Sequence, residues 1–226
     1  MKIKISDLVA EILKKNGVKN IFGLQGGSIV HLFDSFENKK LNVSYNFHEQ
    51  SASLAAVANA KASSKPTCCL VTTGPGSSNA MTGLLAAWQD SVPCIFISGQ
   101  ARTNHTSYGK KVRQVGTQGL NILDIVKPIT KGTFLLKNEF EVKSKIEQAI
   151  ALAISGRPGP VWIDFPVNLT WEKITRPKLN KVKIIRHQPN RNEKKIKLLN
   201  KMIISSKKII LVLGYGLRLS GQAKNL

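Results

Sequence analysis

Several features are scarce in this 226-residue chain, and each shortage excludes a class of protein. The three cysteines, Cys68, Cys69 and Cys94, lie in apolar runs, and their spacing fits neither a zinc site nor a disulfide framework. No apolar run approaches the roughly 20 residues that cross a bilayer, and the N-terminus lacks the apolar core of a signal peptide. We therefore expect a cytoplasmic protein with buried, reduced thiols and no membrane partner.

Acidic residues are also scarce, 13 against 34 Lys and Arg, which leaves a formal net charge of +21. The charge is concentrated between Lys173 and Lys201, where there are eleven Lys or Arg and one acidic residue, Glu193. A basic segment can bind nucleic acid or other anions. This stretch has no aromatic side chain that would stack on bases, so we favour a solvated linker over nucleic-acid binding.

What the chain does contain is a regular alternation of helical and strand patterns. Ser6 is the predicted N-cap of a first helix that ends at Gly17. Further helices are predicted from about residue 28 and at 50–63, 75–89 and 139–155, and strands at 18–24, 43–47, 67–72, 94–98, 129–134 and 160–165. This alternation predicts an α/β fold, with an open, mostly parallel sheet and helices on both faces.

A second α/β unit is predicted to begin after the basic stretch. It consists of a helix at 191–205, a strand at 209–213 and the turn Gly214-Tyr215-Gly216. These residues are too few to close a sheet, so we expect an incomplete unit, from a fragment or a truncated gene. The predicted organisation is a first domain at 1–170, a basic linker at 171–190 and the start of a second domain at 191–226.

Glycine-rich turns and one carboxylate each follow a predicted strand, at Gly26-Gly27, Glu49 and Gly74-Pro75-Gly76. In an open α/β sheet, ligands bind at the carboxyl ends of the strands, where glycine lets them approach the backbone. The pattern alone is weak. Such turns are most often only turns, and a lone glutamate at a helix start is typical of a carboxylate that stabilises the helix dipole.

An ordered set of motifs makes the pattern specific. They are Phe22-Gly23-Leu24-Gln25-Gly26-Gly27, His48-Glu49-Gln50-Ser51-Ala52, Val71-Thr72-Thr73-Gly74-Pro75-Gly76-Ser77-Ser78-Asn79-Ala80, Gly83-Leu84, Asp90-Ser91-Val92-Pro93, Ser98-Gly99-Gln100, Pro128-Ile129-Thr130-Lys131 and Gly156-Arg157-Pro158-Gly159-Pro160-Val161. This set closely resembles the N-terminal, pyrimidine-binding domain of thiamine-diphosphate enzymes, acetolactate synthase large subunits above all. The match runs from about Ile5 to Leu169, and the residues after Arg191 are similar to the start of that family's central domain.

The resemblance implies a role for Glu49. In this family the matching glutamate hydrogen-bonds N1′ of the aminopyrimidine and promotes removal of a proton from the thiazolium ring. The activated cofactor attacks a 2-keto acid, carbon dioxide leaves, and the remaining fragment adds to an acceptor carbonyl. A carboxyl group in an apolar wall can share such a proton, and Phe47, Ala52 and Leu54 suit that setting. With the surrounding motifs, we favour this role over a helix-start charge.

Other site residues are implied by weaker matches. Gly26 and Gly27 match the segment that faces the substrate, and Pro75 and Asn79 match positions near the pyrimidine. A hydrogen bond within the first turn of a helix is an equal alternative for Asn79. We give His48, which precedes the glutamate, no catalytic role.

Two further matches concern the reaction and a second cofactor. Gln118 matches a glutamine that acetolactate synthases place near the reacting carbon, and a solvated loop amide is the alternative. Arg157 matches an arginine that contacts FAD in flavin-dependent members, so FAD is a candidate cofactor, and a surface turn residue is the alternative. Gln25 stands where the family often has proline, and Gly119 where an acidic residue follows the glutamine. These departures leave acetolactate formation and a reaction on another 2-keto acid or a keto sugar as alternatives.

The resemblance also implies that this chain holds only half of a site. The family's Gly-Asp-Gly stretch and later asparagine, which bind Mg²⁺ and the diphosphate, have no match here. We therefore expect no metal ligand in this chain, inactivity of the chain alone, and a homo-oligomer or a second chain that supplies Mg²⁺ and the diphosphate site. The competing hypothesis is a non-enzymatic interaction module.

Overall fold

The computed structural model describes residues 1–184 and 192–221. They form two compact units, residues 1–184 and residues 192–221, which are described separately. The end of the predicted linker (185–190), Arg191 and residues 222–226 lie outside the described residues. No helix in the described ranges is long and apolar enough to cross a bilayer.

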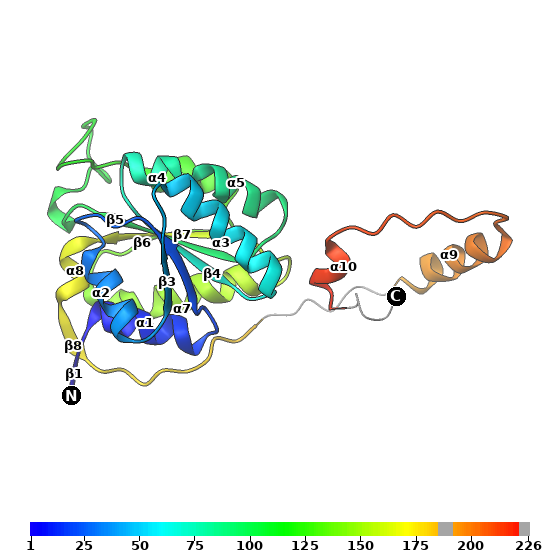
Figure 1. Cartoon of the computed structure of the whole chain (residues 1–226), viewed down its shortest axis with the longest axis horizontal. Helices are drawn as coiled ribbons and strands as arrows, with labels where there is room; N and C mark the ends of the chain where they lie inside the picture. The colour runs from blue at the N-terminus through cyan, green and yellow to red at the C-terminus, as the bar shows by residue number, and fades with distance from the viewer. Residues whose placement is uncertain (185–191, 222–226) are drawn as a thin grey trace. The chain divides into compact units, whose positions relative to one another are not determined.

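Six parallel strands form the sheet of the first unit (Figure 1). In the order β3-β2-β4-β5-β7-β6, they are Asn42–Tyr45, Asn20–Gly23, Thr67–Thr72, Cys94–Gln100, Val161–Pro166 and Thr133–Leu135. Every neighbouring pair is parallel. The central strands are apolar and buried, as expected of strands covered on both faces. The predicted α/β class and parallel sheet are confirmed.

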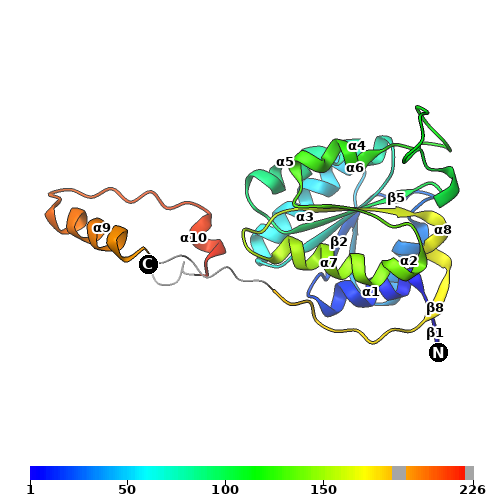
Figure 2. The ribbon, with the colours of Figure 1, turned by 180° about the vertical axis from the view of Figure 1, so that it is seen from behind.

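Helices cover both faces of this sheet (Figures 1 and 2). One layer contains α1 (Ile5–Lys15), α2 (Val30–Asn38), α7 (Val142–Ile154) and α8 (Val167–Trp171). The other contains α3 (Glu49–Ser63), α4 (Pro75–Asn79), α5 (Met81–Gln89) and α6 (Ile122–Val126). The short 3-10 turns η1, η2 and η3 occupy Thr103–His105, Lys127–Ile129 and Glu139–Glu141.

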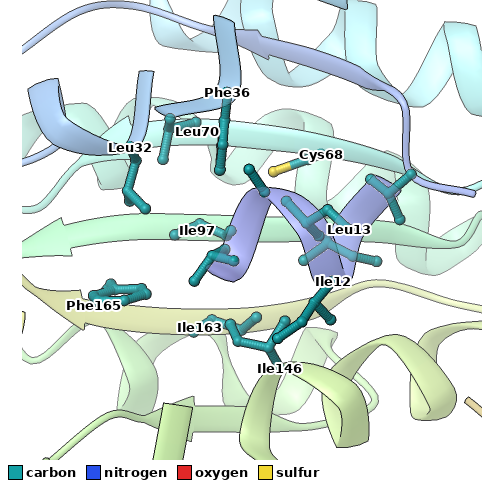
Figure 3. Packing of buried hydrophobic residues seen from close by; sticks show 14 of the residues in the cluster. Ile12, Leu13, Leu32, Phe36, Cys68, Leu70, Ile97, Ile146, Ile163 and Phe165 are labelled. Atoms are coloured by element: carbon teal, nitrogen blue, oxygen red, sulfur yellow. The ribbon is translucent and has the colours of Figure 1, made fainter. Parts of the chain in front are cut away.

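The two layers pack differently. Large aliphatic and aromatic side chains fill the space between the sheet and the first layer, among them Ile12, Leu13, Leu32, Phe36, Ile97, Ile146, Ile163 and Phe165 (Figure 3). On the other face, alanines of α3 allow a close approach. The three cysteines are free and buried, as predicted, and burial raises the pKa of Cys94 to about 12, which keeps its thiol protonated.

The structure corrects the predicted start of the first helix. Its N-cap is Lys4, because strand β1 (Lys2–Lys4) runs directly into it and the amide of Ile5 donates to Glu172 O at 2.9 Å. Ser6 is therefore not the N-cap. It is buried, and its hydroxyl oxygen accepts a hydrogen bond from Ser35 Oγ at 2.8 Å.

Two other predicted elements differ from the structure. The single helix predicted at 75–89 is two helices, α4 and α5, which meet at Ala80. The strand predicted at 129–134 starts later, as β6, because Pro128 lies in the 3-10 turn η2 and the Thr130 hydroxyl donates to Val126 O at 3.1 Å. Helices α6 and α8 were not predicted.

The first part of the predicted linker packs on the first unit. Strand β8 (Lys173–Thr175) pairs with β1 in antiparallel fashion. Arg176 forms an ion pair with Glu11 at 2.8 Å, and the amide of Val182 donates to Asn16 Oδ1 at 2.8 Å. These contacts extend the compact unit beyond the predicted boundary at residue 170.

The second unit contains α9 (Glu193–Ser205) and α10 (Gly216–Leu219). The helix predicted after the linker is present, and the Asn192 side chain caps α9 by accepting from the Lys195 amide at 3.1 Å. The strand predicted at 209–213 does not form, and its residues are exposed. A strand needs a neighbour to satisfy its backbone, and the described part of this unit offers none.

Candidate active site

The strand order places the switch point of the sheet at β2, and we call the edge bordered by Gly26, Thr72 and Gly76 the crevice. This strand lies between β3 and β4, and α2 and α3 leave its neighbourhood on opposite faces of the sheet. At such a switch point the loops after neighbouring strands separate, and α/β proteins bind ligands there. Gly26-Gly27, Glu49 and Gly74-Pro75-Gly76 follow β2, β3 and β4, so all three lie at the same carboxyl edge.

Glu49 is the first residue of α3, and its carboxyl group is half-buried at this edge. Asn79 Nδ2, in the last position of α4, donates to Glu49 Oε2 at 3.1 Å. The other oxygen, Oε1, faces Gly76, where a Cβ would lie 3.1 Å from it. The structure thus brings together three of the predicted site residues, Glu49, Asn79 and Pro75.

Part of the predicted apolar wall is not beside the carboxyl group. Ala52 is buried, but Phe47 is fully exposed and Leu54 is partly exposed. Leu54 projects from the solvent side of α3, while Ala52 points toward the sheet. Within this chain the carboxyl group therefore borders backbone and small side chains.

Thr72, at the end of β4, lies between Gly26 and Gly76, and the sequence analysis gave it no role. A Cβ at Gly26 would lie 2.3 Å from Thr72 Cγ2, and a Cβ at Gly76 would lie 2.5 Å from Thr72 Oγ1. Both positions thus require glycine for the loops to approach this close. In contrast, a Cβ at Gly27 would meet no atom within 4 Å, so the backbone there borders open space.

Two buried polar atoms at this edge have no hydrogen-bond partner among the described residues. Asn46 Oδ1 follows β3, and Thr73 Oγ1 follows β4. Buried polar oxygens are nearly always satisfied in folded proteins, so unsatisfied ones at a strand edge fit a site that receives a hydrogen-bond donor. No local sequence signal distinguished these residues from ordinary turn residues.

Gln118 also reaches this edge, through its backbone. A Cβ at Gly74 would lie 2.5 Å from Gln118 O, so the loop between β5 and α6 rests on the Gly74 turn. Gln118 has φ of 58°, a left-handed conformation that is uncommon for a residue with a side chain. Its side chain is exposed.

Arg157 is the predicted site residue that lies elsewhere. It precedes β7, at the amino edge of the sheet, and its Nε donates to Ser91 Oγ at 2.7 Å. The two residues line a cavity of about 350 Å³ together with Trp88, Gln89, Lys131 and Pro158. The structure does not bring Arg157 together with Glu49.

A buried carboxylate near the loop that carries Gln118 was also missed by sequence reasoning. Asp164 in β7 has no exposed surface, and it accepts hydrogen bonds from Ser98, Gln100 and Tyr108. Burial raises the pKa of Asp164 to about 6, although these hydrogen bonds favour the ionised form. In the sequence, Asp164 is a single polar residue within an apolar strand. Its hydrogen-bond partners lie more than fifty residues away along the chain, so no local pattern identifies them.

The residues present fit the aminopyrimidine half of thiamine diphosphate better than its charged half. The edge offers a carboxyl group with one oxygen facing the crevice, buried acceptor oxygens and closely packed glycines. In the ranges that the structure describes, no three His, Cys, Asp or Glu side chains gather as the ligands of a metal ion would.

The parallel sheet and the crevice at its switch point define an α/β domain with the ligand site of that fold class. Within that class, the chain belongs to the thiamine pyrophosphate enzyme family: residues 3–125 match its N-terminal TPP binding domain. It is an acetolactate synthase-like member.

Three relatives document this similarity. The chain is 32% identical over 220 residues to the acetolactate synthase large subunit of Haemophilus influenzae, covering 95% of this chain and 37% of that protein. It is 32% identical over 229 residues to the probable acetolactate synthase large subunit of Methanocaldococcus jannaschii (99% and 38%). It is 34% identical over 220 residues to the acetolactate synthase large subunit of Lactococcus lactis (96% and 37%). The chain therefore spans well under half the length of these relatives.

Proposed function

We propose that the first unit of this chain holds the aminopyrimidine half of thiamine diphosphate, as part of an enzyme that decarboxylates a 2-keto acid and joins the remaining fragment to an acceptor carbonyl. The observation that carries the proposal is the convergence of Glu49, Asn79 and the glycine-lined crevice beside Thr72. Membership of the thiamine pyrophosphate enzyme family supports it.

Glu49 is the residue to which we assign proton transfer. Asn79 donates to Oε2 and so orients the carboxyl group, while Oε1 faces the space beside Gly76. A carboxyl group held in this way can share a proton with a ring nitrogen through Oε1. The amide of Asn79 cannot itself transfer a proton at neutral pH, so its role is to position Glu49.

The neighbouring residues complete the pyrimidine half-site. Thr73 Oγ1 and Asn46 Oδ1 are the acceptors that we assign to an exocyclic amino group, because both are buried and without a partner in the described ranges. When bound, thiamine diphosphate supplies the electron sink for decarboxylation, and the protein supplies position and electrostatics. Gly27 leaves room on the side that we assign to the 2-keto acid, and we assign Gln118, whose backbone lies against Gly74, to the same substrate.

We further propose that a second chain completes the site by binding Mg²⁺ and the diphosphate, and that this chain alone is inactive. That chain is a second copy or a polypeptide with the diphosphate-binding domain. Exposed apolar side chains of the α3–α5 layer favour such a contact: Phe47, Leu54, Leu85 and Trp88. Phe47 lies two residues before Glu49, so a partner that covered it would exclude water from the carboxyl group. Because Arg157 lies at the opposite edge of the sheet, binding of FAD through it would be a separate event.

The proposal is tested by comparing thiamine with thiamine diphosphate as ligands of the whole chain. If the chain recognises the pyrimidine half, both ligands bind with similar affinity and neither requires Mg²⁺. A fragment-sized contact supplies a dissociation constant of about 1 mM, which chemical-shift changes in NMR spectra detect. Glu49→Gln should weaken both ligands equally.

The matched control is Glu147→Gln, since Glu147 also accepts one hydrogen bond, from Lys143 Nζ at 2.8 Å, and lies in α7, in the other helix layer. This variant should bind like the unaltered chain. Binding of the diphosphate alone, lost on adding salt and unchanged in Glu49→Gln, would show a non-specific anion site and contradict the proposal.

A non-enzymatic interaction module is the second candidate function, and the second unit favours it. Helix α9 exposes Leu199 and Met202 beside Lys197 and Lys201, and none of the described residues of this unit is buried. Such a basic, partly apolar helix suits an acidic partner. Salt-sensitive binding of an acidic peptide, with no response to thiamine, would favour this candidate over the first.

A further inference from the structure

A buried polar cluster lies beside the candidate site. Three neutral donors reach the carboxylate of Asp164: Ser98 Oγ at 2.6 Å, Gln100 Nε2 at 2.8 Å and Tyr108 Oη at 2.9 Å. Trp162 Nε1 donates in turn to Ser98 Oγ at 2.8 Å. Among the described residues, no Lys or Arg forms an ion pair with Asp164. A buried carboxylate without an ionic partner costs stability, so its presence here calls for a compensating role.

The cluster is hydrogen-bonded to both halves of one loop, residues 101–121, which connects β5 to α6. We call the half that follows β5 the first limb and the half that precedes α6 the second limb, and we say that these hydrogen bonds fasten the loop. Tyr108, in the first limb, donates to Asp164 Oδ2. Gln100 Nε2 donates to the same oxygen and also to Leu120 O, in the second limb, at 2.9 Å. A single carboxylate oxygen therefore holds the first limb directly and the second limb through one amide group.

The second limb carries Gln118, two residues before Leu120. The backbone oxygen of Gln118 lies against Gly74, where there is no room for a Cβ. Gln118 also has a φ of 58°, and this left-handed residue lies in the second limb. Gly74 begins the turn of Pro75 and Gly76, which faces Glu49. The hydrogen bonds that start at Asp164 thus reach Leu120, two residues along the chain from the backbone oxygen that lies against Gly74.

We propose that Asp164 is a positioning residue for the candidate site: through Tyr108 and Gln100 it holds loop 101–121 in the conformation that places Gln118 on the Gly74 turn. The proposal rests on the proposed function only in the role given to Gln118. The fastening of the loop is a property of the chain itself and is measured without any ligand.

The test removes one oxygen atom. Tyr108→Phe keeps the ring and deletes the hydroxyl, which donates to Asp164 and also interacts with the backbone of Leu123. The loop carries trypsin sites at Lys110, Lys111 and Arg113, all exposed. In limited digestion of the full chain, these sites should be cut about tenfold faster in the variant, the effect of losing one hydrogen bond to a charged group. Cuts within α9 serve as the internal reference, and an unchanged rate ratio overturns the proposal.

Two further variants separate fastening from ordinary packing. Tyr45→Phe deletes a hydroxyl that donates to an exposed carboxylate, that of Glu37, so it should leave the loop rate unchanged. Asp164→Asn keeps an acceptor oxygen and should retain most of the protection, whereas Asp164→Leu keeps the volume and loses it. Equal protection in the Asn and Leu variants would contradict the proposal. If Asp164→Leu fails to fold, Tyr108→Phe alone decides.

Failure of this inference is distinguishable from failure of the proposed function. Thiamine titration of the unaltered chain tests the function, and trypsin digestion tests the fastening. If the unaltered chain binds thiamine, but Tyr108→Phe leaves the rate of trypsin cleavage in loop 101–121 unchanged, only the inference is contradicted. A chain that does not bind thiamine, but whose loop is freed in Tyr108→Phe, supports the inference and contradicts the function.

Discussion

Glu49 is one side chain whose position depends on loops from several strands. The end of β3 leads into it, Asn79 of α4 orients one oxygen, and Gly76 leaves the other oxygen facing the crevice. The same residue type at a plain helix start would stabilise only the helix dipole. What distinguishes Glu49 is therefore the set of neighbours that the parallel sheet brings to it.

We predict that Glu49→Gln lowers turnover at least about 100-fold in an enzyme assembled with a chain that supplies the diphosphate site, because an amide cannot shuttle a proton. The amide oxygen of the variant side chain can still accept from Asn79, so the thermal midpoint of the isolated chain should change by no more than about 2 °C. Steady-state turnover and calorimetry measure the two effects. Turnover within a factor of about three of the unaltered enzyme would contradict the assigned role.

Asp164 predicts a pH dependence of stability with a definite sign. Burial raises its pKa to about 6 in the folded chain, above the ordinary value of 3.8. Its contribution to stability is therefore fully present below about pH 4 and is lost as pH rises through about 6. At pH 7 the loss is on the order of 3 kcal/mol, since one pKa unit corresponds to about 1.4 kcal/mol. Asp164→Asn should remove this dependence.

The measurement is urea unfolding of both chains between about pH 4 and about pH 7.5. Other carboxylates contribute in the opposite direction, for example Glu141, where the hydrogen bond from Lys145 lowers the pKa, and Asp34, where the hydrogen bond from Lys4 lowers the pKa. The difference between the unaltered chain and Asp164→Asn cancels those contributions. A difference that is constant across the range would show that the folded and unfolded pKa values of Asp164 are equal.

At the scale of elements, the approach of α3 to α5 depends on Gly83. A Cβ there would lie 2.4 Å from Ser53 Oγ and 2.6 Å from the Ser53 backbone carbonyl carbon. Alanine in a helix interior normally gains about 1 kcal/mol over glycine, but here the clash is with backbone and must move the helix. We predict that Gly83→Ala lowers the free energy of unfolding by about 1–3 kcal/mol.

Chemical denaturation measures this effect, with Gln89→Ala, an exposed residue at the end of α5, as the control. The control should change stability by less than about 0.5 kcal/mol. Because α4, the helix of Asn79, contacts both α3 and α5, Gly83→Ala should also weaken thiamine binding. A stabilised Gly83→Ala chain would show that the two helices can separate without cost.

The elements that sequence predicted best are those whose pattern is local. Strand β4 occupies the predicted residues, Thr67–Thr72, because a short apolar β-branched run has few alternatives. Strands β1 and β8 were missed because each is three residues long and forms by pairing with the other, so that Ile3 lies opposite Ile174. The strand predicted at 209–213 had a local pattern but finds no partner in the described part of its unit.

The same division applies to the candidate site. The family motifs identified Glu49, the glycines and Asn79, because each of these residues belongs to a contiguous sequence pattern. Thr72, Thr73 and Asp164 were missed because their importance depends on atoms that distant segments place beside them. A motif also identified Arg157, but the structure places it at the amino edge of the sheet, away from Glu49. A sequence motif does not specify the edge of the sheet at which a residue lies.

At the scale of the whole molecule, the net charge opposes self-association, which is one of the two ways in which a second chain could complete the proposed site. Two copies of a chain with charge +21 repel each other, and salt screens that repulsion over about 10 Å at about 0.1 M. If the apolar α3–α5 layer forms the contact, association should strengthen as salt is raised from about 0.05 M to about 0.5 M. Sedimentation velocity at both salt concentrations measures this.

Leu85→Lys should abolish the association, because it places a charge within the proposed contact. Val30→Lys adds the same charge at an exposed apolar residue of α2, in the other layer, and should associate like the unaltered chain. Association that weakens with salt, or that survives Leu85→Lys, would place the contact elsewhere.

The pairing of β1 with β8 has a consequence for the newly made chain. The ribosome completes residues 2–4 first, but their strand partner, residues 173–175, emerges roughly 170 residues later. At about 5–20 residues per second, that delay is roughly ten to thirty seconds. During this interval the six-stranded sheet can assemble while residues 2–4 are still unpaired, so the amide of Ile5 can donate to Glu172 O only late in the synthesis of this unit.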